Sequence, residues 1–367
     1  MAGVLTPART QLTCGPVPAA VFGNPSPKRA DRSLSHYVSH TLYPYSRYYR
    51  DLLDETGIGR RGIRSRGDLV RLPPTDLASV SDPGALVLRP DRYSMRRYGD
   101  RALVLRSYMS RLLGVEHRFN SGVLEPRFKP LHWTLCSGVP IGSSQADLVK
   151  LGTLGAHSLA LAGVTDRDVL LSVLPPGPSV AHWQLVQGAR TARVAAIHLD
   201  PALDGAADRM AMLGPSVVAG HPADLIRVLG EWHESGRPMA VLIVLCVGAT
   251  EPVTTEERAA VAEQAGGATV VASWAPPGVR ALWTECRRAA VASVYDPALV
   301  PPLHSWPACE VLESGPDGEL LWTAVGWAGS PLVRLRTGIG AVLQDGPCRY
   351  CGESGVLVRP VPAGVRA

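Results

Sequence analysis

The most regular hydrophobic pattern of the chain lies between about residue 130 and residue 275. Short apolar runs alternate there with longer amphipathic runs, which predict strands and helices respectively. We expect strands at 131–137, 168–175, 193–199, 239–248 and 268–274, and helices at 145–163, 181–192, 222–235 and 254–266. Apolar strands that alternate with helices are typical of a parallel sheet covered on both faces. The pattern therefore predicts an α/β fold with a mostly parallel sheet flanked by helices.

The pattern changes on both sides of this region. Residues 1–34 are rich in Pro, Gly and small residues without periodicity, which predicts a loosely ordered arm. Residues 35–57 have helical spacing and belong to the α/β domain, expected at 35–300. After residue 300 short alternating segments flank a Gly-Pro-Asp-Gly turn, which favours a hairpin. We therefore expect a smaller β-rich subdomain at 301–367.

The amino-acid composition of the chain argues against several classes of function. The 367 residues include 37 Lys+Arg and 32 Asp+Glu, and the basic residues are scattered, so a nucleic-acid footprint is not indicated. Seven cysteines, an odd number in a large chain, favour a reducing compartment over a disulfide scaffold. The longest apolar run is shorter than the ~20 residues of a membrane span, and no signal pattern opens the chain. We expect a cytoplasmic protein with neither a membrane nor a nucleic acid as partner.

A Cys-x-x-Cys-Gly sequence near the end of the chain is the clearest chemical motif. Cys348 and Cys351 lie between predicted short strands, whereas redox-active pairs usually open a helix, so a zinc knuckle is the better interpretation. Zinc needs two further ligands, for which Cys286 and His304 are candidates, with Cys309 as an alternative. The motif predicts a structural zinc.

Three segments carry a resemblance to a known family. They are 318–323 (GELLWT), 331–338 (PLVRLRTG) and 348–352 (CRYCG), in this order. The chain resembles the acid-activating, adenylate-forming superfamily, in particular its phenylacetate–CoA ligase-like branch, over roughly 36–360. The resemblance implies the large N-terminal domain of that fold and the reaction of a carboxylic acid with ATP to give an acyl-AMP. In some of these relatives the matching Cys and His residues hold zinc.

The nucleotide-contact positions depart from the family pattern. At the phosphate loop only Ser137 and Gly138 are retained, and the threonines of the family are missing. The aromatic position that follows is retained as Trp274, and Arg336 of the Arg-Thr-Gly turn is retained too. The Asp that follows this turn in the family and holds the ribose is Ile339 here, which has no hydrogen-bonding group. Each lost contact is worth ~1.5–3 kcal/mol, so ATP and Mg²⁺ binding is doubtful.

The acid pocket is expected at the start of the helix at 181–192. His182, Trp183 and Gln184 stand where the family lines this pocket, whereas His198, on an apolar strand, is typical of an ordinary core. A small carboxylic acid is the ligand that the resemblance implies. The family's C-terminal lid domain has no match after the Cys-x-x-Cys, so we expect a partner protein to supply it.

Three functions stay open at this point. The first is acid activation with a degraded nucleotide site and impaired or partner-dependent activity. The second is a non-catalytic homologue that serves as a ligand-binding or protein-interaction subunit. The third is acyl transfer without ATP, with Cys136 as the nucleophile.

Overall fold

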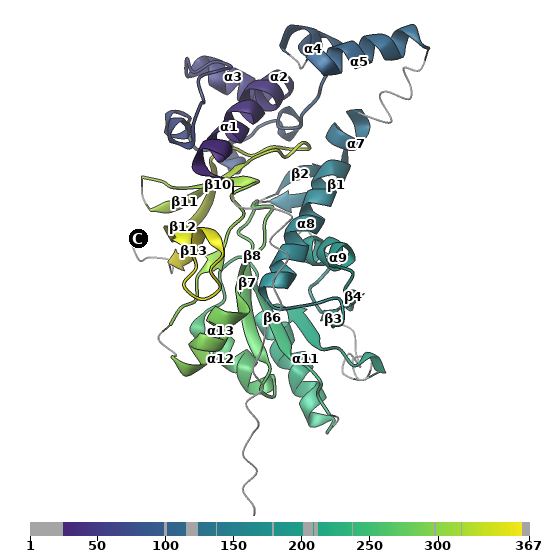
Figure 1. The fold of residues 1–367 in the computed structure, drawn as a ribbon, viewed down its shortest axis with the longest axis vertical. Coiled ribbons are helices and arrows are strands. Elements are labelled where there is room, and N and C mark those ends of the chain that lie inside the picture. The colour runs from purple at the N-terminus through teal and green to yellow at the C-terminus, as the bar shows by residue number, and fades with distance from the viewer. Residues whose placement is uncertain are drawn as a thin grey trace, which may run out of the picture.

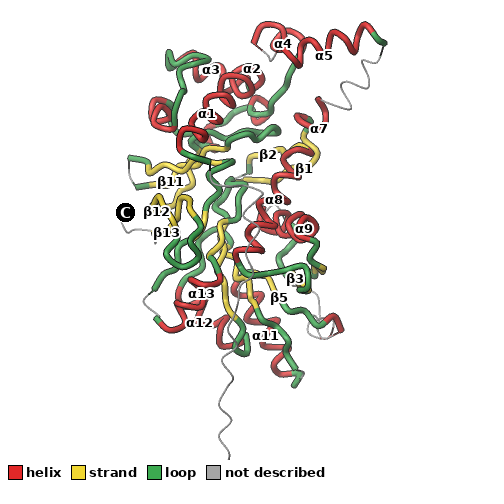
Figure 2. The backbone as a smooth tube through the Cα atoms, in the orientation of Figure 1, coloured by secondary structure: helices red, strands yellow, loops and turns green. Residues whose placement is uncertain are grey.

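The computed structural model describes residues 25–98, 101–114, 124–136, 138–177, 180–200, 208, 212–236, 238–296, 299–316 and 318–361. Within these residues one eleven-stranded sheet runs through the molecule in the order β10-β11-β12-β13-β9-β8-β7-β6-β5-β3-β4. Helices cover one half of it on both faces, whereas the other half is mostly strand (Figures 1 and 2). None of the described helices is both long and apolar enough to cross a bilayer.

The parallel half of the sheet forms the centre of the α/β architecture. Its strands pair in the order β4-β3-β5-β6-β7. They are β3 (Val169–Ser172), β4 (Ala195–His198), β5 (Val217–Gly220), β6 (Ile243–Gly248) and β7 (Thr269–Trp274). Every residue of β6 is buried, as expected for a strand covered on both faces.

Five helices cover this half. They are α8 (Gln145–Leu161), α9 (Val180–Ala192), α11 (Pro222–Glu234), α12 (Thr255–Gln264) and α13 (Arg287–Tyr295). One core joins the strands to α8, α9 and α13, and a second core joins them to α11 and α12 on the opposite face. Because Gly155 and Gly188 have no side chain, α8 and α9 approach closely: a Cβ on Gly155 would lie 2.1 Å from the Gln184 carbonyl oxygen.

The second half of the sheet is antiparallel and continues from β7 without a break. It consists of β8 (Trp283–Glu285), β9 (Leu303–His304), β10 (Glu310–Ser314), β11 (Glu319–Ala324), β12 (Leu335–Pro347) and β13 (Ser354–Val361). Strands β10 and β11 form the hairpin that the Gly-Pro-Asp-Gly turn predicts. The β-rich part is therefore joined to the parallel half by backbone hydrogen bonds between β7, β8 and β9.

The N-terminal part is made of short helices at one end of the molecule (Figure 1). It contains α1 (Pro27–Tyr37), the π-helix η1 (Val38–Leu42), α2 (Tyr43–Tyr45), α3 (Arg47–Glu55), the 3₁₀ helices η2 (Arg66–Arg71), η3 (Leu77–Ser79) and η4 (Pro83–Ala85), α4 (Arg92–Tyr98), α5 (Arg101–Leu112) and α7 (Glu125–Phe128). A separate two-stranded hairpin, β1 (Pro130–Cys136) and β2 (Val139–Ser144), leads into α8.

The α/β prediction is confirmed, with three differences in detail. Helix α1 begins at Pro27, within the predicted arm, because Pro is favourable at the first helical position and Leu34 packs in the core; residues 1–24 lie outside the described part. The strand predicted at 131–137 pairs only with β2 and stays out of the main sheet. Strand β5 was not predicted, because its four residues run directly into the pattern of α11.

Candidate functional site

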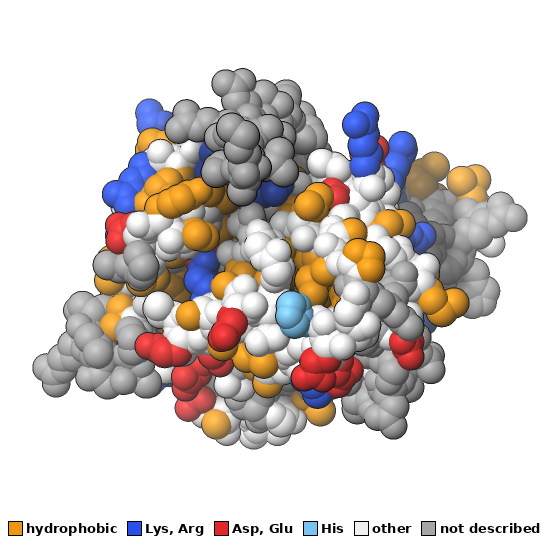
Figure 3. All heavy atoms as spheres, turned by 90° about the horizontal axis from the view of Figure 1, so that it is seen from below, with side chains coloured by type: hydrophobic (Ala, Val, Ile, Leu, Met, Phe, Trp, Pro, Cys, Tyr) orange, Lys and Arg blue, Asp and Glu red, His pale blue; other side chains and the backbone are white. Residues whose placement is uncertain are grey.

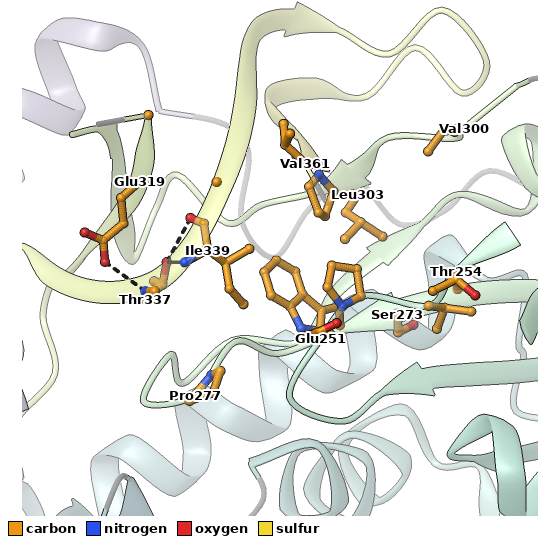
Figure 4. Close-up of a pocket in the computed structure, with 18 of the residues that line it drawn as sticks. Glu251, Thr254, Ser273, Pro277, Val300, Leu303, Glu319, Thr337, Ile339 and Val361 are labelled. Atoms are coloured by element: carbon orange, nitrogen blue, oxygen red, sulfur yellow. Dashed lines mark hydrogen bonds between the residues drawn. The ribbon is translucent and has the colours of Figure 1, made fainter. Parts of the chain in front are cut away.

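A cavity of about 1230 Å³ opens where the parallel strands β6 and β7 end. Ligands of open α/β sheets bind outside the carboxyl ends of their strands, so this is the expected place for a site. The opposite wall comes from β12, β13 and the segment before β9, as Figure 4 shows. The cavity therefore lies between the parallel and the antiparallel halves of the sheet.

One wall of the cavity is apolar. Ile339 on β12 points into the cavity, with Leu303 and Val361 beyond it (Figure 4). Gly338, immediately before it, has a φ of 73°, a conformation that glycine adopts without strain. The residue that follows the Arg-Thr-Gly turn, Ile339, thus places a hydrocarbon side chain at the cavity.

Arg336 lines the same cavity, and its charge is balanced. Its Nη2 lies 2.8 Å from a carboxylate oxygen of Glu319, and its Nε donates to the same oxygen at 2.9 Å. The other oxygen of Glu319 accepts a hydrogen bond from the Gly338 N–H at 2.8 Å. Glu319 therefore neutralises Arg336 and fixes the turn that carries Ile339.

Trp274, the aromatic residue that the resemblance assigns to the nucleotide site, also lines the cavity. Its side chain is 1% exposed and packs edge-on against Trp283 at 5.7 Å between ring centroids. Among the described residues, its indole N–H has no hydrogen-bond partner. Gly138 is exposed in the β1–β2 turn and is not among the described lining residues, and Ser137 lies outside the described part of the chain. The cavity thus brings together two of the four predicted nucleotide-contact residues.

Carboxylates dominate the charged lining. They are Asp76, Glu251, Glu256, Glu285 and Glu319, and Arg336 is the one Lys or Arg among the described lining residues. Glu285 is buried and paired with Arg258, and its second oxygen accepts from the Ala272 N–H at 3.0 Å. Burial raises its pKa, against the effect of Arg258. The described lining therefore carries an excess of acidic groups.

Sequence reasoning missed the role of Glu319 and the acidic residues that follow β6. Glu319 belongs to the quoted Gly-Glu-Leu segment, but its partner is 17 positions away, so only the register of β11 and β12 shows the pairing. Glu251 comes just after a fully buried strand, and polar residues at such a position are a signal that sequence alone provides.

The predicted acid-pocket residues lie on α9, away from the described lining of this cavity. The side-chain oxygen Oε1 of Gln184 accepts from the Leu282 N–H at 2.8 Å, and the Trp183 indole N–H donates to the Gly177 carbonyl at 3.1 Å. His182 Nδ1 is 3.1 Å from the Leu174 carbonyl oxygen. These bonds explain how the start of α9 is fixed, and contact with a substrate stays a prediction for all three residues.

An aromatic and imidazole cluster surrounds the start of α9. His132 contacts Trp183 with ring centroids 4.4 Å apart, and His182 contacts His198 at 5.3 Å. Burial lowers the pKa of all three histidines. They are therefore held in the neutral form at neutral pH.

The four predicted zinc ligands lie together. The Sγ atoms of Cys286, Cys348 and Cys351 and a ring nitrogen of His304 are all within 4.8 Å of one another. Cys286 Sγ lies 4.0 Å from Cys348 Sγ, close to the ~3.8 Å between two thiolates on one tetrahedral zinc. Cys309 is not part of the group, and its thiol donates to the Trp306 carbonyl at 3.4 Å.

Strand ends position these ligands. Cys286 follows β8 and precedes α13, His304 ends β9, and Cys348 and Cys351 occupy the turn between β12 and β13. Hydrogen bonding from Cys286, and then from His304, lowers the pKa of Cys351 to about 4. Burial lowers the pKa of His304, but hydrogen bonds with Cys348 and Cys351 outweigh it and raise the value to about 9. Three cysteines and one histidine at these distances fit a four-coordinate zinc.

The chain was compared with known proteins by sequence and by structure. No family model matches the sequence, and no curated protein is significantly similar to it. Among solved structures, 2-hydroxyisobutyryl-CoA ligase in an open conformation with 2-HIB-AMP and CoA matches with a TM-score of 0.65 and 16% identity, over 91% of this chain and 68% of the ligase. The same ligase in its postadenylation state with R3-HIB-AMP matches with a TM-score of 0.66 and 15% identity, over 92% and 67%.

This likeness concerns the fold, because the identity is low. It covers almost all of the chain and about two thirds of the length of the ligase. It includes both halves of the sheet and agrees with the resemblance drawn from the sequence segments. The chain has the fold of the adenylate-forming superfamily.

Proposed function

We propose that this chain is an acyl-CoA ligase-like protein derived from carboxylic-acid activation, with a degraded nucleotide site and impaired or partner-dependent activity. The observation that carries the proposal is the position of Ile339. It points into the cavity from the turn where the resembling family has the Asp that holds the ribose (Figure 4). A hydrocarbon side chain accepts no hydrogen bond from a ribose hydroxyl, so a main anchor of the nucleotide is lost.

The charges of the cavity support the same proposal. ATP is a polyanion, and the described lining offers it carboxylates and one arginine that Glu319 already neutralises. Like charges in one site repel each other, which disfavours the nucleotide unless Mg²⁺ offsets them. The retained Trp274 and the apolar wall suit the hydrocarbon part of a small carboxylic acid or of another ligand.

We propose a structural zinc in the Cys/His cluster formed by Cys286, His304, Cys348 and Cys351. The four residues supply all four positions of a tetrahedral ion, which leaves no open position for a substrate. The ion would tie the β12–β13 turn to the ends of β8 and β9. Such a site needs reduced thiols, which is our reason to place the protein in the cytoplasm.

A protein partner is part of the proposal. The matched ligase is longer by about a third, and the resembling family carries a lid that completes adenylation. If these 367 residues are the whole working unit, a partner would have to supply that lid. A nucleic-acid partner is not proposed, because the Lys and Arg residues are scattered along the sequence. On the face in Figure 3 the basic side chains form no continuous stripe.

A non-catalytic role is the second candidate, as a ligand-binding or interaction subunit. The ion pair between Arg336 and Glu319 supports this candidate, because Glu319 compensates part of the charge that Arg336 would offer to a nucleotide. Calorimetric titration with ATP and Mg²⁺, paired with ATP–pyrophosphate exchange over a panel of carboxylic acids, tests the proposal. Ordinary nucleotide affinity would contradict a degraded site, and binding of an acid without exchange would favour the second candidate.

A further inference from the structure

Helix α5 carries an apolar stripe that faces away from the molecule. Leu105, Tyr108, Met109, Leu112 and the adjacent Leu113 are spaced as neighbours on one helical face, and their side chains are between 46% and 69% exposed. A surface helix normally turns such a stripe toward the core. Contiguous exposed apolar side chains of this kind mark interaction sites.

The opposite side of α5 is the one that attaches the helix to the molecule. Val104 packs against the small core that contains Tyr45, Met95 and Phe128, and Ser110 is buried. On a helical wheel these two positions lie across the axis from Leu105 and Met109. The outward apolar stripe is therefore not the attachment face of α5.

Arginines surround the stripe. Residues 91–114 contain six Arg and two Asp and no Lys, a net formal charge of +4. Arg106 and Arg111 are exposed and flank the stripe on its two sides, and Arg96 and Arg97 are exposed on the neighbouring helix α4. Figure 1 shows α4 and α5 together at one end of the molecule, away from the parallel half of the sheet. The stripe is thus an apolar strip within a basic surface.

The positive charge around the stripe indicates which of three candidates binds there: residues 1–24 of the chain, a second copy of the helix, or an acidic partner. Residues 1–24 of the same chain contain Arg9 and no acidic residue, so they offer no charge complement. A second copy of the helix would bring arginines against arginines, which is unfavourable. An occupant with carboxylates around an apolar centre would pair with Arg106 and Arg111, and guanidinium–carboxylate pairs are among the stronger charged hydrogen bonds.

We propose that α4 and α5 form a docking surface for a protein partner that presents an acidic amphipathic helix or groove. Helix α5 has twelve residues and is about 18 Å long, so the stripe offers a partner a short contact surface. Tyr, Met and Arg are enriched at protein interfaces. Helices that lie on a membrane carry Trp, Phe and Leu on their apolar face, and this segment contains Leu but neither Trp nor Phe. The surface is separate from the cavity, so its role does not depend on the function proposed for the cavity.

The test uses a defined probe. A fluorescein-labelled helical peptide of about 20 residues, with Leu on one face and Glu on its flanks, is titrated with the full chain and followed by fluorescence anisotropy. The same peptide with Lys for every Glu is the charge control. We expect the Glu peptide to bind and the Lys peptide to bind at least about tenfold more weakly, with a difference that decreases in high salt.

Variants locate the binding. Leu105→Glu and Leu112→Glu should each weaken the Glu peptide about tenfold, and Arg106→Glu with Arg111→Glu should reverse the preference toward the Lys peptide. Val294→Glu on α13, at a position that is 69% exposed, is the matched control and should change nothing. All replaced side chains are exposed, and thermal melting checks that each variant is folded.

Four results would overturn the proposal. They are equal binding of both peptides, no binding of either, binding of phosphatidylserine vesicles in place of the peptide with the same variants defective, and self-association in sedimentation that Leu112→Glu abolishes. The third result would assign the surface to a membrane, and the fourth to a second copy.

Discussion

The guanidinium of Arg336 and the carboxylate of Glu319 form an ion pair with 2.8 Å between nitrogen and oxygen at the edge of the cavity. The pair joins β12 to β11, and the second oxygen of Glu319 holds the backbone of Gly338. The turn that carries Ile339 is therefore fixed, while the charge of Arg336 is compensated. The first two predictions test the proposal that the nucleotide site is degraded at these side chains.

Ile339→Asp should restore part of the nucleotide affinity. The new carboxylate would stand at the cavity and accept hydrogen bonds from ribose hydroxyls, each worth ~1.5–3 kcal/mol. We expect about tenfold or more gain in ATP affinity with Mg²⁺ present, measured by calorimetry. Ile339→Val is the control and should leave the affinity unchanged; an equal affinity of both variants would show that this position does not limit binding.

Glu319→Gln, in the Ile339→Asp background, should raise the affinity for ATP further. The replacement leaves Arg336 with its charge uncompensated, and because the pair is partly exposed we expect a gain of no more than about fivefold. Glu313→Gln, which breaks the pair with Arg334 outside the described lining, is the control. The idea fails if both glutamine variants bind ATP equally.

Replacing the knuckle cysteines should remove zinc. Cys348→Ser and Cys351→Ser each delete one of four ligands, so elemental analysis should find zinc in the parent chain and little in either variant. The melting temperature should fall with the zinc content. Cys309→Ser is the matched control, because Cys309 is buried but lies outside the cluster. Undiminished zinc in the two knuckle variants would reject the site.

The chain should lose stability as the pH falls below about 6.5. Burial lowers the pKa of His132, His182 and His198, so below the ordinary histidine pKa the unfolded chain binds more protons than the folded one. The part of the unfolding free energy that comes from these three histidines is therefore fully present above about pH 6.5 and decreases as the pH falls toward their lowered pKa values. The slope is at most about 1.4 kcal/mol per pH unit for each proton.

Urea unfolding at a series of pH values measures this dependence. His198→Gln removes one of the three groups and should flatten the decrease. If the variant and the parent chain lose stability with the same slope, the His198 ring does not contribute to it.

Gln184→Ala should affect stability more than ligand binding. The replacement leaves the buried Leu282 N–H without its acceptor, which costs about 1–3 kcal/mol of unfolding free energy. Gln187→Ala on the same helix is the comparison and should cost less. A loss of ligand affinity at unchanged stability would instead support the predicted role of Gln184 in the acid pocket.

The sequence predicts most of the parallel half, because buried strands and amphipathic helices have distinct periods. The grouping of Cys286, His304, Cys348 and Cys351 was also predicted, since a Cys-x-x-Cys turn is a local signal that calls for two further ligands; the zinc itself stays a proposal. Features that depend on long-range register were not predicted. The pairing of Arg336 with Glu319 requires the alignment of two strands. The outward stripe of α5 could not be predicted, because local periodicity does not show which side of a helix packs against the rest of the molecule.

The most direct test of a degraded nucleotide site is ATP–pyrophosphate exchange by the purified 367-residue chain, with Mg²⁺ and a panel of carboxylic acids, alongside a calorimetric titration of ATP. A nucleotide site without the ribose carboxylate and with a compensated arginine predicts exchange far slower than that of an intact adenylate-forming enzyme and only weak binding of ATP. Exchange with any acid, at a rate typical of an intact adenylate-forming enzyme, would contradict the account.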